Sequence, residues 1–197
     1  MNLPNKLTML RIIMIPLFIV CFFLPDAWIF GTVQGNPIHI KYCIAGIIFL
    51  LAYITDTLDG IIARKRNMVT DFGKLMDPTA DKLLTGAAMI MLCKYEVMSF
   101  GNFLMPVFTF IVLGRELFVS GMRQLAAAQG KVVAAKKIGK AKTTVQFIAL
   151  LIVLLFGEIF AAVKVPVDFV LVCIAVALTI WSGIDYAISG KYLFQQR

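Results

Sequence analysis

Apolar runs long enough to cross a lipid bilayer recur along the whole chain and constrain its fold more than any other feature. A helix needs about 20 apolar residues to cross a hydrocarbon core about 30 Å thick. We expect six such helices, at about residues 12–30, from 42 to beyond 56, 77–95, 103–126, 144–163 and 165–188. The hydrophobic fraction of 60% and the mean hydropathy of +0.90 are too high for an ordinary soluble domain. The sequence therefore predicts an all-α polytopic membrane protein that folds as one domain over residues 1–197.

The first residues alternate between polar and apolar side chains ahead of the first long run. Asn5, Thr8 and Arg11 are interleaved with leucines, a pattern typical of a short amphipathic helix that lies in the membrane interface. A cytoplasmic cap on the first span explains the same pattern equally well. Pro16 and Pro25 are expected to kink or end that span, because proline removes a backbone hydrogen bond from a helix.

Basic residues are distributed very unevenly between the two sides of the expected helices. Of the 19 Lys and Arg residues, 16 fall on the side that holds both termini, and only Lys41, Lys94 and Lys164 fall on the other. By the positive-inside rule, the side with the termini is cytoplasmic. In so apolar a chain, the net charge of +8 indicates contacts with anionic lipid head groups, and we exclude nucleic acid as a partner. His39 falls in a loop on the opposite side and is interpreted as an ordinary exposed residue.

Four aspartates lie beside the apolar runs. They are Asp56 and Asp59, three residues apart, and Asp77 and Asp81, four residues apart. On a helix each pair falls on one face, about 60° or 40° apart around the axis, so all four converge if the two helices are neighbours. Two anions about 4 Å apart repel by about 4 kcal/mol at an effective dielectric of about 20, and oxygen ligands without His or Cys suit Mg²⁺ or Mn²⁺. The alternative is a set of solvated carboxylates at helix ends.

This stretch resembles the signature of the CDP-alcohol phosphotransferase family, D-x2-D-G-x2-A-R-x8-G-x3-D-x3-D. The sequence matches every fixed position, at Asp56, Asp59, Gly60, Ala63, Arg64, Gly73, Asp77 and Asp81. The motif covers only 26 residues, but the length and hydropathy of the rest agree with the family. The resemblance implies a membrane enzyme that moves a phosphatidyl or similar group from a CDP-linked lipid to an alcohol and releases CMP.

The same resemblance implies roles for individual residues. Asp56, Asp59 and Asp77 would hold two Mg²⁺ or Mn²⁺ ions, with Asp81 also near the metals and acting as general base toward the acceptor hydroxyl. Binding of the CDP-linked lipid is implied for Asn5, Thr8, Arg11, Gly60, Ala63, Arg64 and Gly73. The small residues among them would let the cytidine diphosphate lie against the backbone. A homodimer packed through membrane helices is a further implication.

A second group of charged residues interrupts the later apolar runs. Arg115 and Arg123 are eight residues apart, which is about 80° around a helix, so both can face one cavity. Guanidinium groups bind phosphate in bidentate fashion, and Lys140 and Lys142 add positive charge. We interpret these four residues as a binding site for an acceptor phosphate. In the alternative interpretation, Arg115 forms an ion pair with Glu116 and the lysines contact lipid head groups.

Three shorter motifs, by their resemblance to motifs of known proteins, narrow the choice of acceptor alcohol. They are L-P-N-K-L-T-M-L-R at 3–11, G-R-E at 114–116 and I-G-K-A-K-T at 138–143, and they are similar to motifs of the bacterial members that make phosphatidylglycerophosphate. The implied partners are CDP-diacylglycerol, glycerol 3-phosphate and the lipid bilayer of a bacterial inner or plasma membrane. Another acceptor, such as inositol phosphate, is the nearest alternative. A cation-coupled transporter is the alternative from another class, although the second half of the chain has no matching acidic site.

Overall fold

The structure, a computed structural model, describes residues 3–65, 71–94, 103–130 and 137–189, with side chains over 8–57, 79–94, 103–130 and 138–189. Its helices are α1 (Leu3–Cys21), α2 (Ile40–Lys65), α3 (Asp71–Lys94), α4 (Met105–Ala128), α5 (Lys137–Val163) and α6 (Val167–Ser189). Two antiparallel strands, β1 (Ile29–Val33) and β2 (Asn36–His39), form a hairpin between α1 and α2. The predicted helical fold is therefore confirmed, with the hairpin as an element that the sequence analysis missed.

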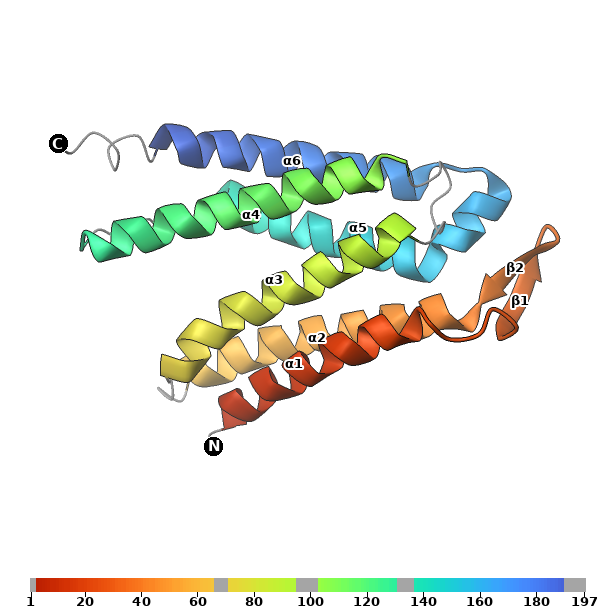
Figure 1. Cartoon of the computed structure of the whole chain (residues 1–197), viewed down its shortest axis with the longest axis horizontal. Helices are drawn as coiled ribbons and strands as arrows, with labels where there is room; N and C mark the ends of the chain where they lie inside the picture. The colour runs from red at the N-terminus through yellow and green to blue at the C-terminus, as the bar shows by residue number, and fades with distance from the viewer. Residues whose placement is uncertain (1–2, 66–70, 95–102, 131–136, 190–197) are drawn as a thin grey trace.

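The helices form one elongated bundle (Figure 1). α1 packs along α2, α5 packs against both α2 and α6, and α3 lies against α1 and α4. The hairpin lies at one end of the bundle, which we call the hairpin end. The start of α1 and the end of α6 lie at the opposite end (Figure 1).

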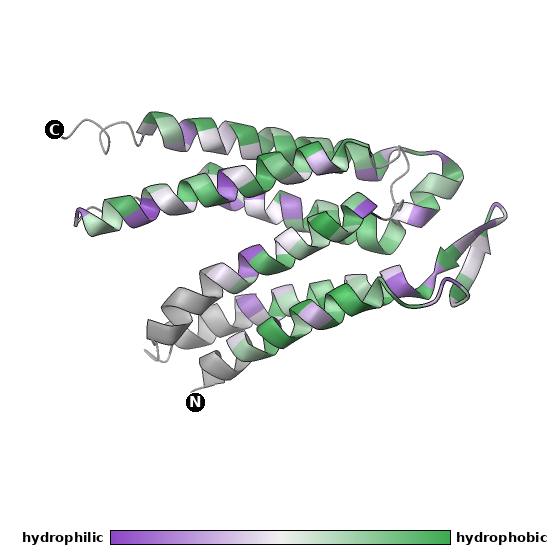
Figure 2. Cartoon of the chain, viewed as in Figure 1, coloured by the Kyte–Doolittle hydropathy of each residue, from purple (hydrophilic) through white to green (hydrophobic). Residues whose placement is uncertain are grey.

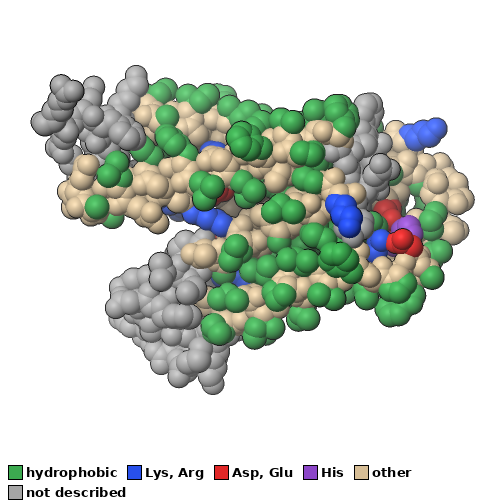
Figure 3. All heavy atoms as spheres, viewed as in Figure 1, with side chains coloured by type: hydrophobic (Ala, Val, Ile, Leu, Met, Phe, Trp, Pro, Cys, Tyr) green, Lys and Arg blue, Asp and Glu red, His purple; other side chains and the backbone are tan. Residues whose placement is uncertain are grey.

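Apolar side chains both fill the bundle and cover its outside. In the interior, Phe18 packs edge-on against Phe22 at 5.3 Å between ring centroids, and Phe49 stacks on Phe147 at 5.3 Å. On the outside, large apolar side chains such as Phe110 are exposed. Figure 3 shows hydrophobic side chains over much of the described surface, and Figure 2 shows hydrophobic residues along the described parts of the helices. A helix that is apolar all round suits a lipid environment rather than water.

Four helical segments in the described part are long and apolar enough to cross a membrane. They are Ile40–Thr57, Met105–Ala128, Ile138–Val163 and Val167–Ser189. The shorter apolar segment Thr8–Cys21 belongs to α1. These four segments match four of the six spans that hydropathy predicts, so the membrane character of the chain is confirmed.

The first predicted span differs most from the structure. The sequence predicts an interfacial helix followed by a span over residues 12–30, whereas α1 is one continuous helix that passes through Pro16 and ends at Cys21. The strand β1 then begins at Ile29. Hydropathy does not distinguish a strand from a helix in a short apolar stretch. The stronger local signal is Gln34 and Gly35, which adopt positive φ values of 49° and 82°, as a two-residue hairpin turn requires.

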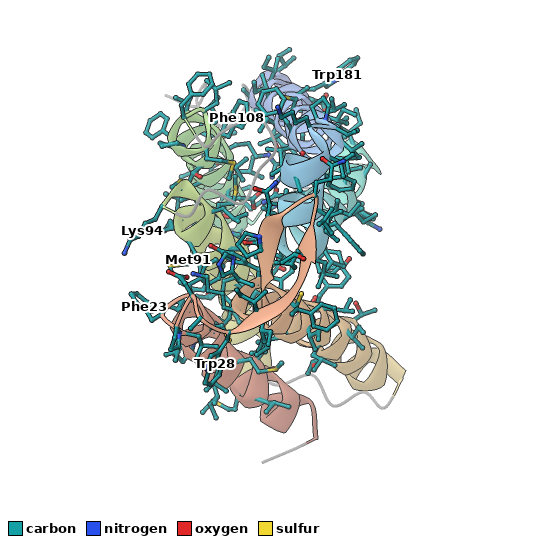
Figure 4. All side chains as sticks on the ribbon, turned by 90° about the vertical axis from the view of Figure 1, so that its right-hand side faces the viewer. Phe23, Trp28, Met91, Lys94, Phe108 and Trp181 are labelled. Carbon is teal, nitrogen blue, oxygen red and sulfur yellow. The ribbon has the colours of Figure 1, made fainter. Side chains whose placement is uncertain are left out.

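Two pairs of polar side chains connect the hairpin region to the rest of the structure at this end. His39 donates its backbone N–H to Glu158 Oε2 at 2.7 Å, and its Nδ1 lies 2.5 Å from Glu158 Oε1. His39 is thus a partly buried link to α5, and the prediction of an ordinary exposed residue is wrong. Lys41 donates to Asp26, and this hydrogen bond lowers the pKa of the Asp26 carboxyl. Figure 4 shows the bundle from this end, with the hairpin on the side that faces the viewer.

Candidate active site

A polar cavity of about 590 Å³ opens at the end of the bundle opposite the hairpin, which we call the cavity end. It is lined by Tyr53, Asp56, Asp81, Lys82, Arg115, Glu116, Val119, Ser120, Arg123, Gly139, Lys140, Thr143, Thr144 and Tyr186. These residues come from α2, α3, α4, α5 and α6. Figure 3 shows Lys and Arg atoms gathered in the hollow beneath α4. This recess therefore gathers seven charged side chains from four helices.

Asp56 of α2 and Asp81 of α3 form what we call the acidic wall of this cavity. Asp56 Oδ1 lies 2.7 Å from Nη1 of Arg11, which α1 brings to the wall. The Arg11 side chain is fully buried, whereas the Asp56 side chain is 33% exposed. The carboxylate therefore faces both a guanidinium and the open cavity. Thr8 is also buried, one helical turn before Arg11 on α1.

The remaining signature residues lie on the same helices, but their side chains fall outside the described part. Asp59, Gly60, Ala63 and Arg64 lie on α2, Gly73 and Asp77 lie on α3, and Asn5 lies on α1. Among the side chains that are described, no group of three or more His, Cys, Asp or Glu residues is close enough to share an ion. The backbone nevertheless places Asp59 about one turn beyond Asp56 and Asp77 about one turn before Asp81.

The acidic wall fits a hard divalent cation. Asp56 and Asp81 line one cavity from different helices, so their negative charges add at the same place. Sites for Mg²⁺ and similar ions are built from oxygen ligands such as carboxylates. Asp56 and Asp81 supply carboxylate oxygens to this wall. A divalent ion would offset the repulsion between the two carboxylates.

Arg115, Arg123 and Lys140 form what we call the basic wall. Arg115 Nη1 donates to Glu116 Oε1 at 3.0 Å, and its Nη2 donates to Ser182 of α6. Arg123 Nη2 donates to the Tyr186 hydroxyl at 2.6 Å. The two arginines, although two turns apart on α4, thus line the same cavity. The pairing of Arg115 with Glu116, which the sequence left open as an alternative, coexists with this placement.

Lys142 occupies a different position from Lys140. Its side chain is 3% exposed, and its Nζ lies 2.5 Å from Glu116 Oε1. It lines a smaller recess next to the main cavity, together with Asp81 and Gln146. Lys142 is therefore paired with Glu116, which lines the cavity. The side chain of Lys140 is exposed and lines the cavity directly.

Several cavity residues were missed by the sequence analysis. Lys82 donates to Ser120 of α4, and Ser120 donates to the backbone carbonyl of Glu116 at 2.6 Å. Tyr53 stacks on Phe147 with 3.6 Å between ring centroids and forms an aromatic side of the cavity. The adjacency of Lys82 to Asp81 was the available signal, whereas an aromatic residue within an apolar run is usually a core residue.

The fold and the cavity together define a class of protein: a helical membrane protein with carboxylates and guanidiniums gathered in one polar recess. Residues 1–181 match the family described as CDP-alcohol phosphatidyltransferase. The chain therefore belongs to this family, and the resemblance found in the aspartate signature is confirmed.

Individual relatives cover nearly the whole chain. A Bacillus subtilis protein is 40% identical over 186 residues, covering 94% of this chain and 93% of its own length. A Rickettsia felis protein is 37% identical, with coverage of 98% and 97%. A Salmonella typhimurium protein is 35% identical, with coverage of 96% and 95%. All three carry the name CDP-diacylglycerol–glycerol-3-phosphate 3-phosphatidyltransferase.

Proposed function

We propose that this protein transfers the phosphatidyl group of CDP-diacylglycerol to glycerol 3-phosphate, giving phosphatidylglycerophosphate and CMP. The observation that carries the proposal is the shared cavity, in which the carboxylates Asp56 and Asp81 lie with the guanidiniums of Arg115 and Arg123. An acceptor that itself bears a phosphate matches a basic wall beside the reacting centre. The names of the full-length relatives support the same acceptor.

The proposed setting is a bacterial inner or plasma membrane, with six spans, both termini and the cavity on the cytoplasmic side. Support comes from charge, because 16 of the 19 Lys and Arg residues fall on the side of the termini. The start of α1 and the end of α6 also lie at one end of the bundle (Figure 1). A homodimer packed through membrane helices completes the proposal.

Four aspartates would hold one or two Mg²⁺ or Mn²⁺ ions: Asp56, Asp59, Asp77 and Asp81. When bound, such ions neutralise the diphosphate and stabilise the departing CMP. The CDP portion would lie along α1 and the signature, against Asn5, Thr8, Arg11, Gly60, Ala63, Arg64 and Gly73. Small residues in that set permit close approach of the ligand to the backbone.

The chain's own groups would then perform the transfer. Arg115, Arg123 and Lys140 bind the phosphate of glycerol 3-phosphate. Lys142 offsets the negative charge of Glu116 beside them. Asp81 accepts the proton of the attacking hydroxyl. The oxygen of that hydroxyl forms a bond to the phosphorus of the phosphatidyl group, and the bond from this phosphorus to the CMP oxygen breaks. Proton transfer to a positioned carboxylate contributes about 10²- to 10⁴-fold to a rate.

The direct test supplies purified protein with CDP-diacylglycerol, Mg²⁺ and one acceptor at a time, and measures the CMP released. Release that depends on glycerol 3-phosphate is expected. Release that depends instead on inositol phosphate would reassign the acceptor within the family. No CMP with any acceptor would refute the transferase, and ion flux in vesicles would then support the transporter alternative.

A further inference from the structure

One buried tyrosine of α6 lies at the basic wall. The proposed chemistry assigns no role to it. Tyr186 is 2% exposed and lines the cavity. It lies four residues after Ser182 and seven after Thr179, so the three share one face of the helix. All three are buried, whereas the opposite face of α6 carries exposed apolar residues such as Trp181. Buried hydroxyls need hydrogen-bond partners, and for Ser182 and Tyr186 these partners are the two arginines of α4.

The ring of Tyr186 lies close to both guanidiniums. The Cζ of Arg115 is 5.5 Å from the ring centroid, and the Cζ of Arg123 is 5.4 Å from it. Both distances are within the range of a favourable cation–π contact. Two like charges in one recess repel each other, and an aromatic ring attracts both without neutralising either. Tyr186 therefore holds the two arginines together while preserving their charge.

The two arginines differ in how their charge is matched. Arg115 forms an ion pair with Glu116 at 3.0 Å. Among the side chains that the structure describes, no carboxylate forms an ion pair with Arg123, and its acceptor is the neutral hydroxyl of Tyr186. The positive charge of Arg123 therefore stays available to an anionic ligand, with its direction fixed by a group that does not compete for the charge.

Two glycines border this arrangement, and one of them, Gly183, is packed tightly against it. A Cβ added at Gly183 would lie 3.2 Å from Cγ of Arg115, and a Cβ added at Gly139 would lie 3.7 Å from Cε2 of Tyr186. The arginine stem is therefore packed tightly against α6 at Gly183. At Gly139 of α5 an added Cβ would make only an ordinary van der Waals contact with the tyrosine.

We infer that Tyr186 is a positioning residue that sets Arg115 and Arg123 at a fixed separation to bind the phosphate of the acceptor. The inference rests on the proposed function, because it assigns Tyr186 to the same acceptor site. Tyr186 touches neither substrate in this scheme. It acts through the arginines, so its loss affects binding of the phosphorylated acceptor and leaves the CDP-linked lipid unaffected.

The test compares Tyr186→Phe with the unaltered protein. The change keeps the ring beneath both guanidiniums and removes only the hydroxyl that accepts from Arg123. The KM for glycerol 3-phosphate is expected to rise about three- to tenfold, the range for loss of one ordinary hydrogen bond, because Arg123 keeps its charge. The kcat and the KM for CDP-diacylglycerol are expected to stay within about twofold of their original values. Inhibition by inorganic phosphate, competing with glycerol 3-phosphate, should weaken by the same factor as acceptor binding.

Tyr42→Phe is the matched control, because Tyr42 is a buried tyrosine of α2 beside His39 at the hairpin end. It should leave both KM values and phosphate inhibition unchanged. Equal KM and phosphate inhibition in Tyr186→Phe and the unaltered protein would overturn the inference. So would a parallel rise of both KM values with a lower melting temperature, which is the signature of a merely structural role. Failure of the proposed function is distinguishable, since the unaltered protein would then release no CMP in response to glycerol 3-phosphate.

Discussion

The two ends of the bundle use charged residues in different ways. At the hairpin end, polar side chains meet in pairs: Lys41 with Asp26, and His39 with Glu158. At the cavity end, Asp56 and Asp81 share a recess with Lys82, Arg115, Glu116, Arg123 and Lys140. There Glu116 alone contacts two cations, Arg115 and Lys142. At the cavity end, several cations and anions are thus linked in one network, whereas Lys41 and His39 at the hairpin end contact separate carboxylates.

The difference separates structural charges from functional charges. A pair that is satisfied internally needs no ligand, and its removal should change stability. Clustered like charges are costly unless a ligand of opposite sign binds. Substitutions at the cavity end should therefore change catalysis, and substitutions at the hairpin end should change folding.

The largest effect is expected for Asp81→Asn at the cavity end. The substitution keeps the size of the side chain but removes the negative charge that would hold a metal ion and accept a proton. The kcat for CMP release should fall by about 10³-fold or more, with the melting temperature nearly unchanged. Asp26→Asn, which removes a carboxylate at the hairpin end, is the control and should retain full kcat. Substantial activity in Asp81→Asn would refute the assigned role.

Arg115→Ala should have the next largest effect. Loss of a charged donor to the acceptor phosphate is expected to raise the KM for glycerol 3-phosphate by about 10- to 100-fold, with a smaller change in kcat. Steady-state kinetics with each substrate varied in turn would measure this split. Lys94→Ala removes a cation that lies beside Phe23 at the hairpin end and provides the comparison. An unchanged acceptor KM in Arg115→Ala would count against the phosphate site.

Glu158→Gln tests the hairpin end. The amide can still accept a hydrogen bond from His39, but the contact is no longer assisted by charge. Stability should fall by about 1 kcal/mol, which corresponds to about 2–4 °C in the melting temperature of a chain of this size. Catalysis should be unaffected, because Glu158 lies far along α5 from the cavity residues Lys140 and Thr144. A catalytic defect without loss of stability would contradict the division between the two ends.

The smallest effect concerns pH. The hydrogen bond from Lys41 lowers the pKa of Asp26 in the folded protein, so the unfolded chain binds the proton more readily. The stabilisation is present at neutral pH and is lost as the pH falls below about 4, near the carboxyl's ordinary pKa. Melting curves of the protein and of Asp26→Asn should converge as the pH is lowered through this range. A difference that stays constant with pH would exclude the pair as its source.

The sequence predicted four of the spans, the aspartate signature and the family, because each depends on local spacing or on hydropathy. The hairpin was missed, since β1 begins at Ile29, within an apolar run that suits either a strand or a helix. Tyr186 and Lys82 were missed for another reason: their roles depend on α4 lying beside α6 and α3, and tertiary neighbours leave no periodic signal along the chain. Lys140 and Lys142 looked equivalent in sequence, yet one faces the cavity and the other is bonded to Glu116.

The contact between Arg11 and Asp56 bears on how the protein is made. α1 leaves the ribosome before α2 and carries a guanidinium that is fully buried in the finished fold. A charged side chain that is buried without a partner is costly. The carboxylate partner of Arg11 is synthesised only after the hairpin and most of α2. Packing of α1 against α2 completes this ion pair, so the two helices have an energetic reason to associate early in assembly.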